Sequence, residues 1–146
     1  MATSDSKEVV IEASLDEIIA VLDDIEAMPE WNSDQESAEI LDRTDDGHPH
    51  QVKMRVKAAG MADEMVVAYT YSGNVVSSSL VSSGRLKKQE SKWTMTPEGD
   101  KTRLKFDLTV DPSVPIPGFI LKRALKGAMN DNTEGLRKRV LSLKKG

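Results

Sequence analysis

The clearest pattern along this chain is an alternation of apolar and polar residues over three segments, residues 50–59, 61–72 and 102–110. Alternation with a period of two is typical of β-strands that bury one face and expose the other. Weaker patterns of the same kind occupy residues 7–13, 36–43, 75–82 and 85–96. We therefore expect about seven strands.

Tight turns join the later strands. Asp45-Asp46-Gly47, Gly73-Asn74 and Pro97-Glu98-Gly99-Asp100 consist of residues that favour turns. Because a tight turn joins only antiparallel neighbours, the predicted sheet is antiparallel. In residues 85–96 a bulge would reverse the alternation, so the sequence does not determine which side chains of that strand face inward.

Two short helical segments follow the first strand. Ser14 and Glu17 have the spacing of a capping box, which predicts that a helix begins at this point. The apolar residues of this helix recur at helical spacing: Leu15, Ile18, Ile19 and Leu22. Residues 25–31 are expected to form a brief second helix or a turn, because Pro29 prevents a longer one.

A much longer helical pattern ends the chain. Pro117 can serve as the first residue of this helix, since proline is favoured at that position. One stripe of the helix carries Leu121, Leu125, Met129, Asn132, Leu136, Val140 and Leu143. Gly127 and Gly135 lie within it and cost about 1 kcal/mol each relative to Ala. Both glycines would allow a neighbouring segment or a ligand to approach the helix closely.

The order of these elements predicts an α+β fold, with a strand, two helices, six strands and a long helix. A chain of 146 residues is expected to form a single domain over residues 1–146, with residues 1–6 disordered. A half-buried sheet needs a partner for its apolar face, and the C-terminal helix is the candidate.

Composition excludes several kinds of function. The chain has no Cys, so disulfides, thiolate nucleophiles and Cys-ligated zinc are excluded. The net charge of −4 argues against a nucleic-acid partner, because phosphate contacts need concentrated Lys and Arg. Acidic residues crowd the region up to Asp46 and basic residues crowd the last 25 positions. A solvated helix face explains the basic end more simply than an acidic partner does.

The sequence also predicts where the protein is found. No apolar run approaches the roughly 20 residues of a membrane span, so no integral membrane association is expected. The start of the chain lacks the features of a signal peptide, which predicts a cytoplasmic protein. We expect a monomer or a weak homodimer.

Several segments together resemble a known family. They are Glu12 to Glu17, Asp24 to Trp31, Asp46-Gly47 and Val114 to Phe119, in the order strand, two helices, six strands, helix. The chain is similar to the polyketide cyclase/dehydrase branch of the START-related superfamily, also called SRPBCC or Bet v 1-like, and to its small actinobacterial members. The resemblance implies a helix-grip fold, in which a curved antiparallel sheet wraps a long C-terminal helix around an internal hydrophobic cavity. It carries over no catalytic motif, because the superfamily has none in common.

Strand alternation and the helix stripe then predict which residues line the cavity. The predicted lining is Trp31, Met54, Val56, Met65, Val67, Tyr69, Tyr71, Leu80, Trp93, Met95, Phe106, Leu108, Phe119, Leu125, Met129 and Asn132. Methionines among them suit an adaptable apolar pocket. The competing interpretation is that these side chains simply pack against one another, and Trp31 in particular suits a packing anchor beside a bend.

Polar candidates are few. Tyr69, Tyr71, Ser78 and Asn132 could each hydrogen-bond to a ligand. His48 and His50 lie near acidic residues, but their position at a predicted hairpin tip favours a solvated turn over a metal site. We expect no metal and no cofactor.

Three functions remain open. The first is binding of a small hydrophobic molecule, lipid-like, polyketide-like or aromatic, by a carrier, sensor or chaperone. The second is a cyclase or dehydrase that acts on a ligand in the same cavity without a metal or cofactor. The third is a protein-interaction module. The scarcity of inner acid–base groups favours the first and argues against an enzyme.

Overall fold

The computed structural model describes residues 2–58 and 60–145. Met1, Ala59 and Gly146, which the predicted segments included, lie outside the described residues. The elements are β1 (Thr3–Ile11), α1 (Leu15–Asp23), η1 (Ile25–Glu30), β2 (Gln35–Ile40), β3 (Gln51–Ala58), β4 (Met61–Ser72), β5 (Val75–Ser83), β6 (Leu86–Glu98), β7 (Lys101–Pro112), α2 (Gly118–Asn130), η2 (Asp131–Gly135) and α3 (Leu136–Lys145).

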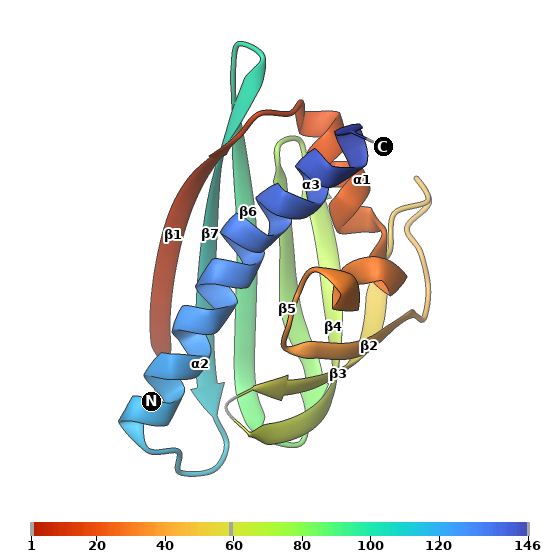
Figure 1. Cartoon of the computed structure of the whole chain (residues 1–146). Helices are drawn as coiled ribbons and strands as arrows, with labels where there is room; N and C mark the ends of the chain where they lie inside the picture. Colours follow the sequence, from red (N-terminus) through yellow and green to blue (C-terminus); the bar gives the residue numbers. More distant parts are fainter. Residues whose placement is uncertain (1, 59, 146) are drawn as a thin grey trace.

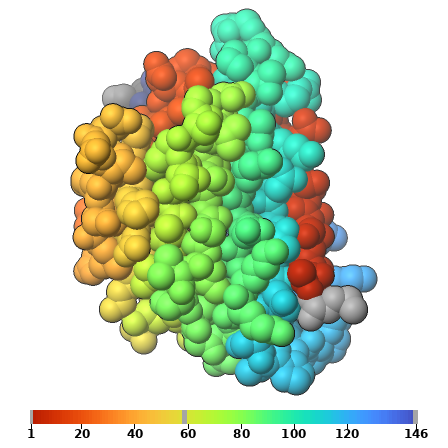
Figure 2. All heavy atoms as spheres, turned by 180° about the vertical axis from the view of Figure 1, so that it is seen from behind, coloured from red at the N-terminus to blue at the C-terminus, as the bar shows by residue number. Residues whose placement is uncertain are grey.

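The described strands form one antiparallel sheet of seven, in the order β1-β7-β6-β5-β4-β3-β2. The continuous helix of α2, η2 and α3 crosses one face of this sheet diagonally, and α1 and η1 lie on the same side (Figure 1). Seen from behind, the strands lie side by side with no helix over them (Figure 2). The α+β prediction and the helix-grip arrangement are confirmed.

Strand β1 corrects the prediction that residues 1–6 are disordered. The strand begins at Thr3, which pairs with Val110, so four residues before the predicted start belong to the sheet. Ser4 Oγ and Thr109 Oγ1 lie 2.7 Å apart across the two strands. This part of β1 is polar, and the pairing depends on backbone groups of β7, which a local hydrophobic pattern does not reveal.

The structure of β6 shows which of its side chains face inward, a question that the sequence left open. Its register against β7 shifts between Leu86 and Lys88, so a bulge lies at the start of the strand. After the bulge, Ser91, Trp93 and Met95 are buried. Lys88 and Glu90 are therefore on the outer face, where their Nζ and Oε1 atoms lie 3.5 Å apart.

The capping box at the start of α1 is confirmed. Ser14 Oγ accepts a hydrogen bond from Glu17 N at 3.2 Å, and Glu17 Oε1 accepts one from Ser14 N at 2.9 Å. Residues Ile18 and Leu22 are buried against the sheet and the C-terminal helix, as the helical spacing predicts. The short helix η1 then packs on β2.

The C-terminal helix contains one π turn, η2, between its two α-helical halves. The turn buries two consecutive residues, Asn132 and Thr133, where a regular stripe would bury one. Of the predicted stripe, Leu143 is the exception, because its side chain is 54% exposed near the end of the chain.

The basic end of this helix finds its partners within the protein. Arg137 donates to both carboxylate oxygens of Glu12, at 3.0 and 2.8 Å, which holds the pKa of Glu12 below its usual range. Lys144 donates to the carbonyl oxygen of Glu12, and Arg139 lies 3.5 Å from Glu30. The acidic N-terminal part and the basic C-terminal part therefore meet in the folded chain.

The two helix glycines should respond differently to alanine. Nothing lies within 4 Å of a Cβ added at Gly127, so Gly127→Ala should raise the free energy of unfolding. The gain should be roughly 0.5–1 kcal/mol, because alanine loses less backbone entropy in a helix. A Cβ at Gly135 would lie 3.0 Å from the carbonyl oxygen of Trp31, so Gly135→Ala should lack this gain. Urea unfolding followed by circular dichroism measures both, and equal gains would contradict a tight contact at Gly135.

Candidate functional site

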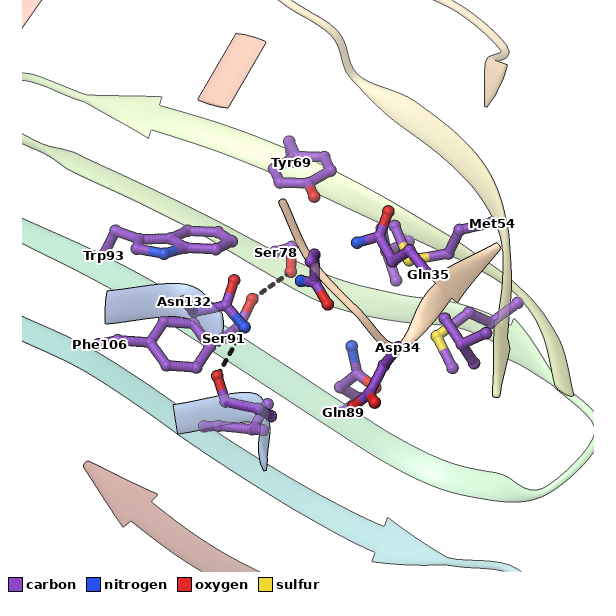
Figure 3. Close-up of a pocket in the computed structure, with 16 residues that line it drawn as sticks. Asp34, Gln35, Met54, Tyr69, Ser78, Gln89, Ser91, Trp93, Phe106 and Asn132 are labelled. Carbon is purple, nitrogen blue, oxygen red and sulfur yellow. Dashed lines mark hydrogen bonds between the residues drawn. The ribbon is translucent and has the colours of Figure 1, made fainter. Parts of the chain in front are cut away.

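A pocket of about 140 Å³ lies between the middle of the sheet and the C-terminal helix near η2 (Figure 3). Strands β3 to β7 contribute most of its walls. Residues predicted from the sequence that line it are Met54, Val56, Met65, Val67, Tyr69, Trp93, Phe106, Leu108 and Asn132. The other lining residues are Asn32, Asp34, Gln35, Ser78, Gln89, Ser91 and Ala128.

Three aromatic rings form one end of the pocket. The rings of Tyr69 and Trp93 are stacked with centroids 6.4 Å apart, and the centroid of Phe106 lies 5.1 Å from that of Trp93. These residues come from β4, β6 and β7, and their side chains share the inner face because of strand alternation. Each ring is at most 4% exposed, so the aromatic end is closed to solvent.

The opposite end is polar, and it comes from a loop that strand alternation could not place. Asn32 and Asp34 lie between the end of η1 and the start of β2, and Gln35 is the first residue of β2. Asn32 N donates to Met28 O at 2.8 Å, and Lys57 N donates to Asp34 O at 2.7 Å, which holds the loop against η1 and β3. The sequence offers only a polar run after Trp31, which by itself indicates a surface loop.

Some polar groups of the pocket are already paired with one another. The hydroxyl oxygens of Ser78 and Ser91 lie 2.5 Å apart, and Asn132 Nδ2 donates to Ala128 O at 2.9 Å (Figure 3). Back-bonding by Asn132 occurs at the π turn, where the helical hydrogen-bond pattern changes. The π turn therefore positions a side-chain amide at the pocket.

Other polar groups there have no partner among the described residues. Gln35 Oε1 is buried without a hydrogen bond, and so is Trp93 Nε1. The hydroxyl of Tyr69 has no hydrogen bond to a described residue, and it points toward the space between Ser78 and Gln35 (Figure 3). Burial raises the pKa of this hydroxyl, so it stays protonated and can donate. Buried polar groups without partners are rare in folded proteins, so these groups are candidates for hydrogen bonds to a ligand.

Asp34 is the one carboxylate among the described residues that line the pocket. Its pKa is raised, first because the side chain is partly buried and second because the negative charge of Asp131 is near. Asp131 itself accepts a hydrogen bond from Ser33 Oγ at 2.8 Å. No described residue donates a hydrogen bond to the carboxylate of Asp34 or forms an ion pair with it, so no protein group lowers its pKa.

The comparisons with known proteins agree with this architecture. The family model described as "Polyketide cyclase / dehydrase and lipid transport" matches residues 3–141. The chain belongs to this family. A START superfamily protein from Mycobacterium smegmatis is 31% identical, with a TM-score of 0.86 over 96% of this chain and 98% of that one. None of the curated proteins matches the chain.

Two more distant structures share the fold. The protein TTHA0849 from Thermus thermophilus is 20% identical, with a TM-score of 0.83 over 97% of this chain and 99% of that one. The Zhui aromatase/cyclase from Streptomyces sp. R1128 is 12% identical, with a TM-score of 0.82 over 96% of this chain and 94% of that one. The superfamily includes proteins that bind hydrophobic ligands and polyketide cyclases or dehydrases. In the described residues, no helix is long and apolar enough to cross a membrane.

Seven residues predicted as lining lie outside this pocket of the family fold. Phe119 is 69% exposed at the second position of α2, so its predicted inward position is wrong. Trp31 directly follows η1. Its carbonyl oxygen lies against Gly135, and the residue borders two outer grooves beside α3. Its role is closer to the packing anchor that the sequence also allowed.

Tyr71, two residues after Tyr69, makes its contacts outside the pocket. Its hydroxyl donates to Pro49 O at 2.8 Å, and its ring stacks on His48 with centroids 4.3 Å apart. The remaining residues outside the pocket are Leu80, Met95, Leu125 and Met129. Met95 and Met129 belong to the filled core, Leu80 packs against it, and Leu125 lines a different pocket.

The two histidines do not share a site. His48 Nδ1 lies 2.7 Å from Asp23 Oδ2, whereas His50 Nδ1 lies 3.2 Å from Asp42 Oδ2. Among the described residues, no three His, Cys, Asp or Glu side chains are grouped so that they could hold a metal ion. His48 therefore fastens the β2–β3 connection to the end of α1, whereas His50 pairs with a carboxylate within the connection.

Asp34 should make the stability of the protein depend on pH. Its folded-state pKa is raised, so stabilisation by its proton is complete below the unfolded pKa and is lost as pH rises through the folded pKa. Asp34→Asn should therefore melt at a higher temperature than wild type at pH of about 7, and the difference should shrink toward pH of about 4. Thermal melts across this range measure it. Asp46→Asn, at an exposed turn residue, is the control, and an equal pH dependence there would contradict the role of burial.

Proposed function

We propose that the pocket binds a small, flat, neutral molecule that carries at least one hydroxyl or carbonyl oxygen, and that the protein acts as a carrier or sensor for it. The size of the pocket supports this class of ligand. Its volume of about 140 Å³ is close to that of an engineered apolar cavity of about 150 Å³ that binds benzene. One six-membered ring fits this volume, whereas drug-sized ligands need about 300–1,000 Å³.

The chemistry of the lining supports a neutral, oxygenated ring. The aromatic end of the pocket offers flat apolar surfaces against which a ring can pack. Tyr69 supplies a hydroxyl donor that faces the pocket. Gln35 supplies a buried carbonyl acceptor without a partner. A phenol or an enol both accepts and donates, so it can satisfy both groups. No Lys or Arg is among the described lining residues, and Asp34 disfavours an anion.

The hydroxyl of Tyr69, which faces the pocket and donates to no described residue, is the observation that carries this proposal. Gln35 Oε1 is buried without a donor, which costs free energy, and a ligand hydroxyl would remove that cost. The family description supports the general class, since it names both polyketide chemistry and lipid transport. Within that class, the dimensions of the pocket favour a ring over a long acyl chain.

The two inner tyrosines provide a matched test of this proposal. 4-Methylphenol should bind to the wild-type protein, and Tyr69→Phe should weaken that binding about 2- to 10-fold, the usual range for one net hydrogen bond. Tyr69→Phe should not lower the melting temperature, because this hydroxyl has no protein partner. Tyr71→Phe should lower the free energy of unfolding by about 1 kcal/mol, because it loses the hydrogen bond to Pro49 O, and should leave binding unchanged.

Binding is measured by titration with ¹⁵N-resolved NMR, since affinities for so small a probe are weak. Toluene, which lacks the hydroxyl, is the control ligand and should show the same affinity for wild type and Tyr69→Phe. The proposal fails if 4-methylphenol does not bind, or if Tyr69→Phe and Tyr71→Phe affect its binding equally.

A second candidate function is favoured by Asp34. A carboxylate of raised pKa at the wall of a pocket is a candidate general base, because its proton affinity is closer to the working pH. The hydroxyl of Tyr69 could donate to the carbonyl oxygen of a β-hydroxy ketone. Asp34 would take a proton from the carbon between the carbonyl and the carbinol, and the C=C bond would form as the C–O bond to the hydroxyl breaks. Asp34 would then return that proton to the leaving hydroxide, which departs as water.

This dehydration has a direct assay. 3-Hydroxycyclohexan-1-one, a β-hydroxy ketone with a single six-membered ring, yields a conjugated enone whose ultraviolet absorbance reports the reaction. If the protein is an enzyme of this kind, wild type accelerates the reaction and Asp34→Asn lowers the rate by about 100-fold or more, the usual contribution of a general base. If wild type gives the rate of buffer alone while 4-methylphenol binds, the protein is a binding protein for this class of ligand and Asp34 is not a catalyst for it.

A further inference from the structure

A second pocket, of about 120 Å³, lies beside the first under the opening turns of α2. Leu121, Ala124 and Leu125 of the helix form one wall, and Ile116 lies before the helix. The lining is almost wholly apolar, with charged residues only at Asp63 and Arg85. This pocket therefore offers hydrocarbon contacts and little else.

The charged residues of this second pocket are engaged with neighbouring groups of the protein. Asp63 Oδ1 accepts from Gly84 N at 3.0 Å, and its other carboxylate oxygen accepts a short hydrogen bond from Ser83 Oγ. Arg85 is exposed, and its Nε donates to Ala62 O at 2.6 Å. These contacts fix the β5–β6 turn against the start of β4 and leave the apolar side chains to define the interior.

The two pockets share part of their lining. Val56, Met65 and Leu108 each border both of them. A shared set of side chains means that one layer of residues separates the two spaces. Met65 is the most adaptable member of this layer, because methionine is unbranched and has three rotatable side-chain bonds. A change of its rotamer would join the spaces without movement of the backbone.

We propose that the two pockets are the two ends of one elongated site, and that the ligand is a hydroxylated or keto ring with a short apolar chain. This inference rests on the proposed function, which requires the ring to occupy the polar pocket. The apolar chain of the ligand then passes Met65 and enters the apolar pocket. At about 30 Å³ for a group the size of a water molecule, 120 Å³ holds about four methylene groups. Together the pockets approach the lower limit of about 300 Å³ that is usual for small-molecule sites.

Two alanines on α2 allow each end of the site to be blocked separately. Ala124 lines the apolar pocket, and Ala128, one helical turn later, lines the polar pocket. The leucine side chain of Ala124→Leu fills part of the apolar pocket, which holds the chain of the ligand. The leucine side chain of Ala128→Leu fills part of the polar pocket, which holds the ring. Both substitutions place the same side chain on the same helix, so each is the control for the other.

The experiment uses 4-alkylphenols with chains from methyl to octyl and the full-length protein. For wild type, affinity should rise about fourfold with each methylene group up to about butyl and then level off. Ala124→Leu should bind 4-methylphenol like wild type and lose the rise with chain length. Ala128→Leu should weaken the binding of every member by the same factor. Circular dichroism and melting temperature establish that both variants fold.

The outcomes separate this inference from the proposed function. If 4-methylphenol binds and longer chains bind no better, or if the rise survives in Ala124→Leu, the two-ended site is wrong and the ring pocket stands. If no alkylphenol binds to wild type, both proposals are wrong. Should Ala124→Leu fail to fold, Met65→Ala replaces it: widening the passage should strengthen binding of the butyl probe more than that of the methyl probe, and equal changes would overturn the inference.

Discussion

Burial of the sheet's inner face beneath a single diagonal helix is the interaction on which the rest of this structure depends. Every strand from β3 to β7 places apolar side chains on that face, and the helix cannot contact all of them along its narrow stripe. At the end of the helix near α1 and η1, Met28, Met95 and Leu136 fill the space between the helix and the sheet. Toward α2, the two pockets between the sheet and the helix remain unfilled.

The polar groups of the pocket are held in place by elements that serve the fold. The loop with Asp34 and Gln35 is fixed by backbone hydrogen bonds to η1 and β3, and Asn132 is fixed by the π turn. Holding an unpaired carboxylate and an unpartnered amide oxygen in this space costs stability. A fold selected for stability alone would replace them with apolar groups. The ligand that we propose would offset part of this cost by pairing with the amide oxygen of Gln35.

Much of the fold was predictable because it follows from local patterns. Alternation along β3, β4 and β7 identifies their inner faces, and these strands supply Met54, Met65 and Phe106 to the pocket. The site was less predictable where the position of a residue depends on backbone contacts with segments far away in the sequence. Asp34 lies in a loop without periodicity, and the inner face of β6 depends on a bulge near Leu86 that only its pairing with β7 reveals. The resemblance to a family predicted a cavity in general terms, but it did not identify these residues as part of the lining.

The π turn η2 has a consequence for how the length of this helix can change. It holds one residue more than a regular helical turn, and each residue rotates a helix by about 100°. Loss of one residue between Asp131 and Gly135 would leave a regular helical turn there, because a π turn holds its extra residue within the width of one turn. α3 would then keep its phase relative to α2, with Leu136 and Val140 toward the core and Arg137 near Glu12. Loss of one residue within α2 would instead rotate α3 by about 100° relative to the start of the helix, so η2 is the place where this helix best tolerates a change of length.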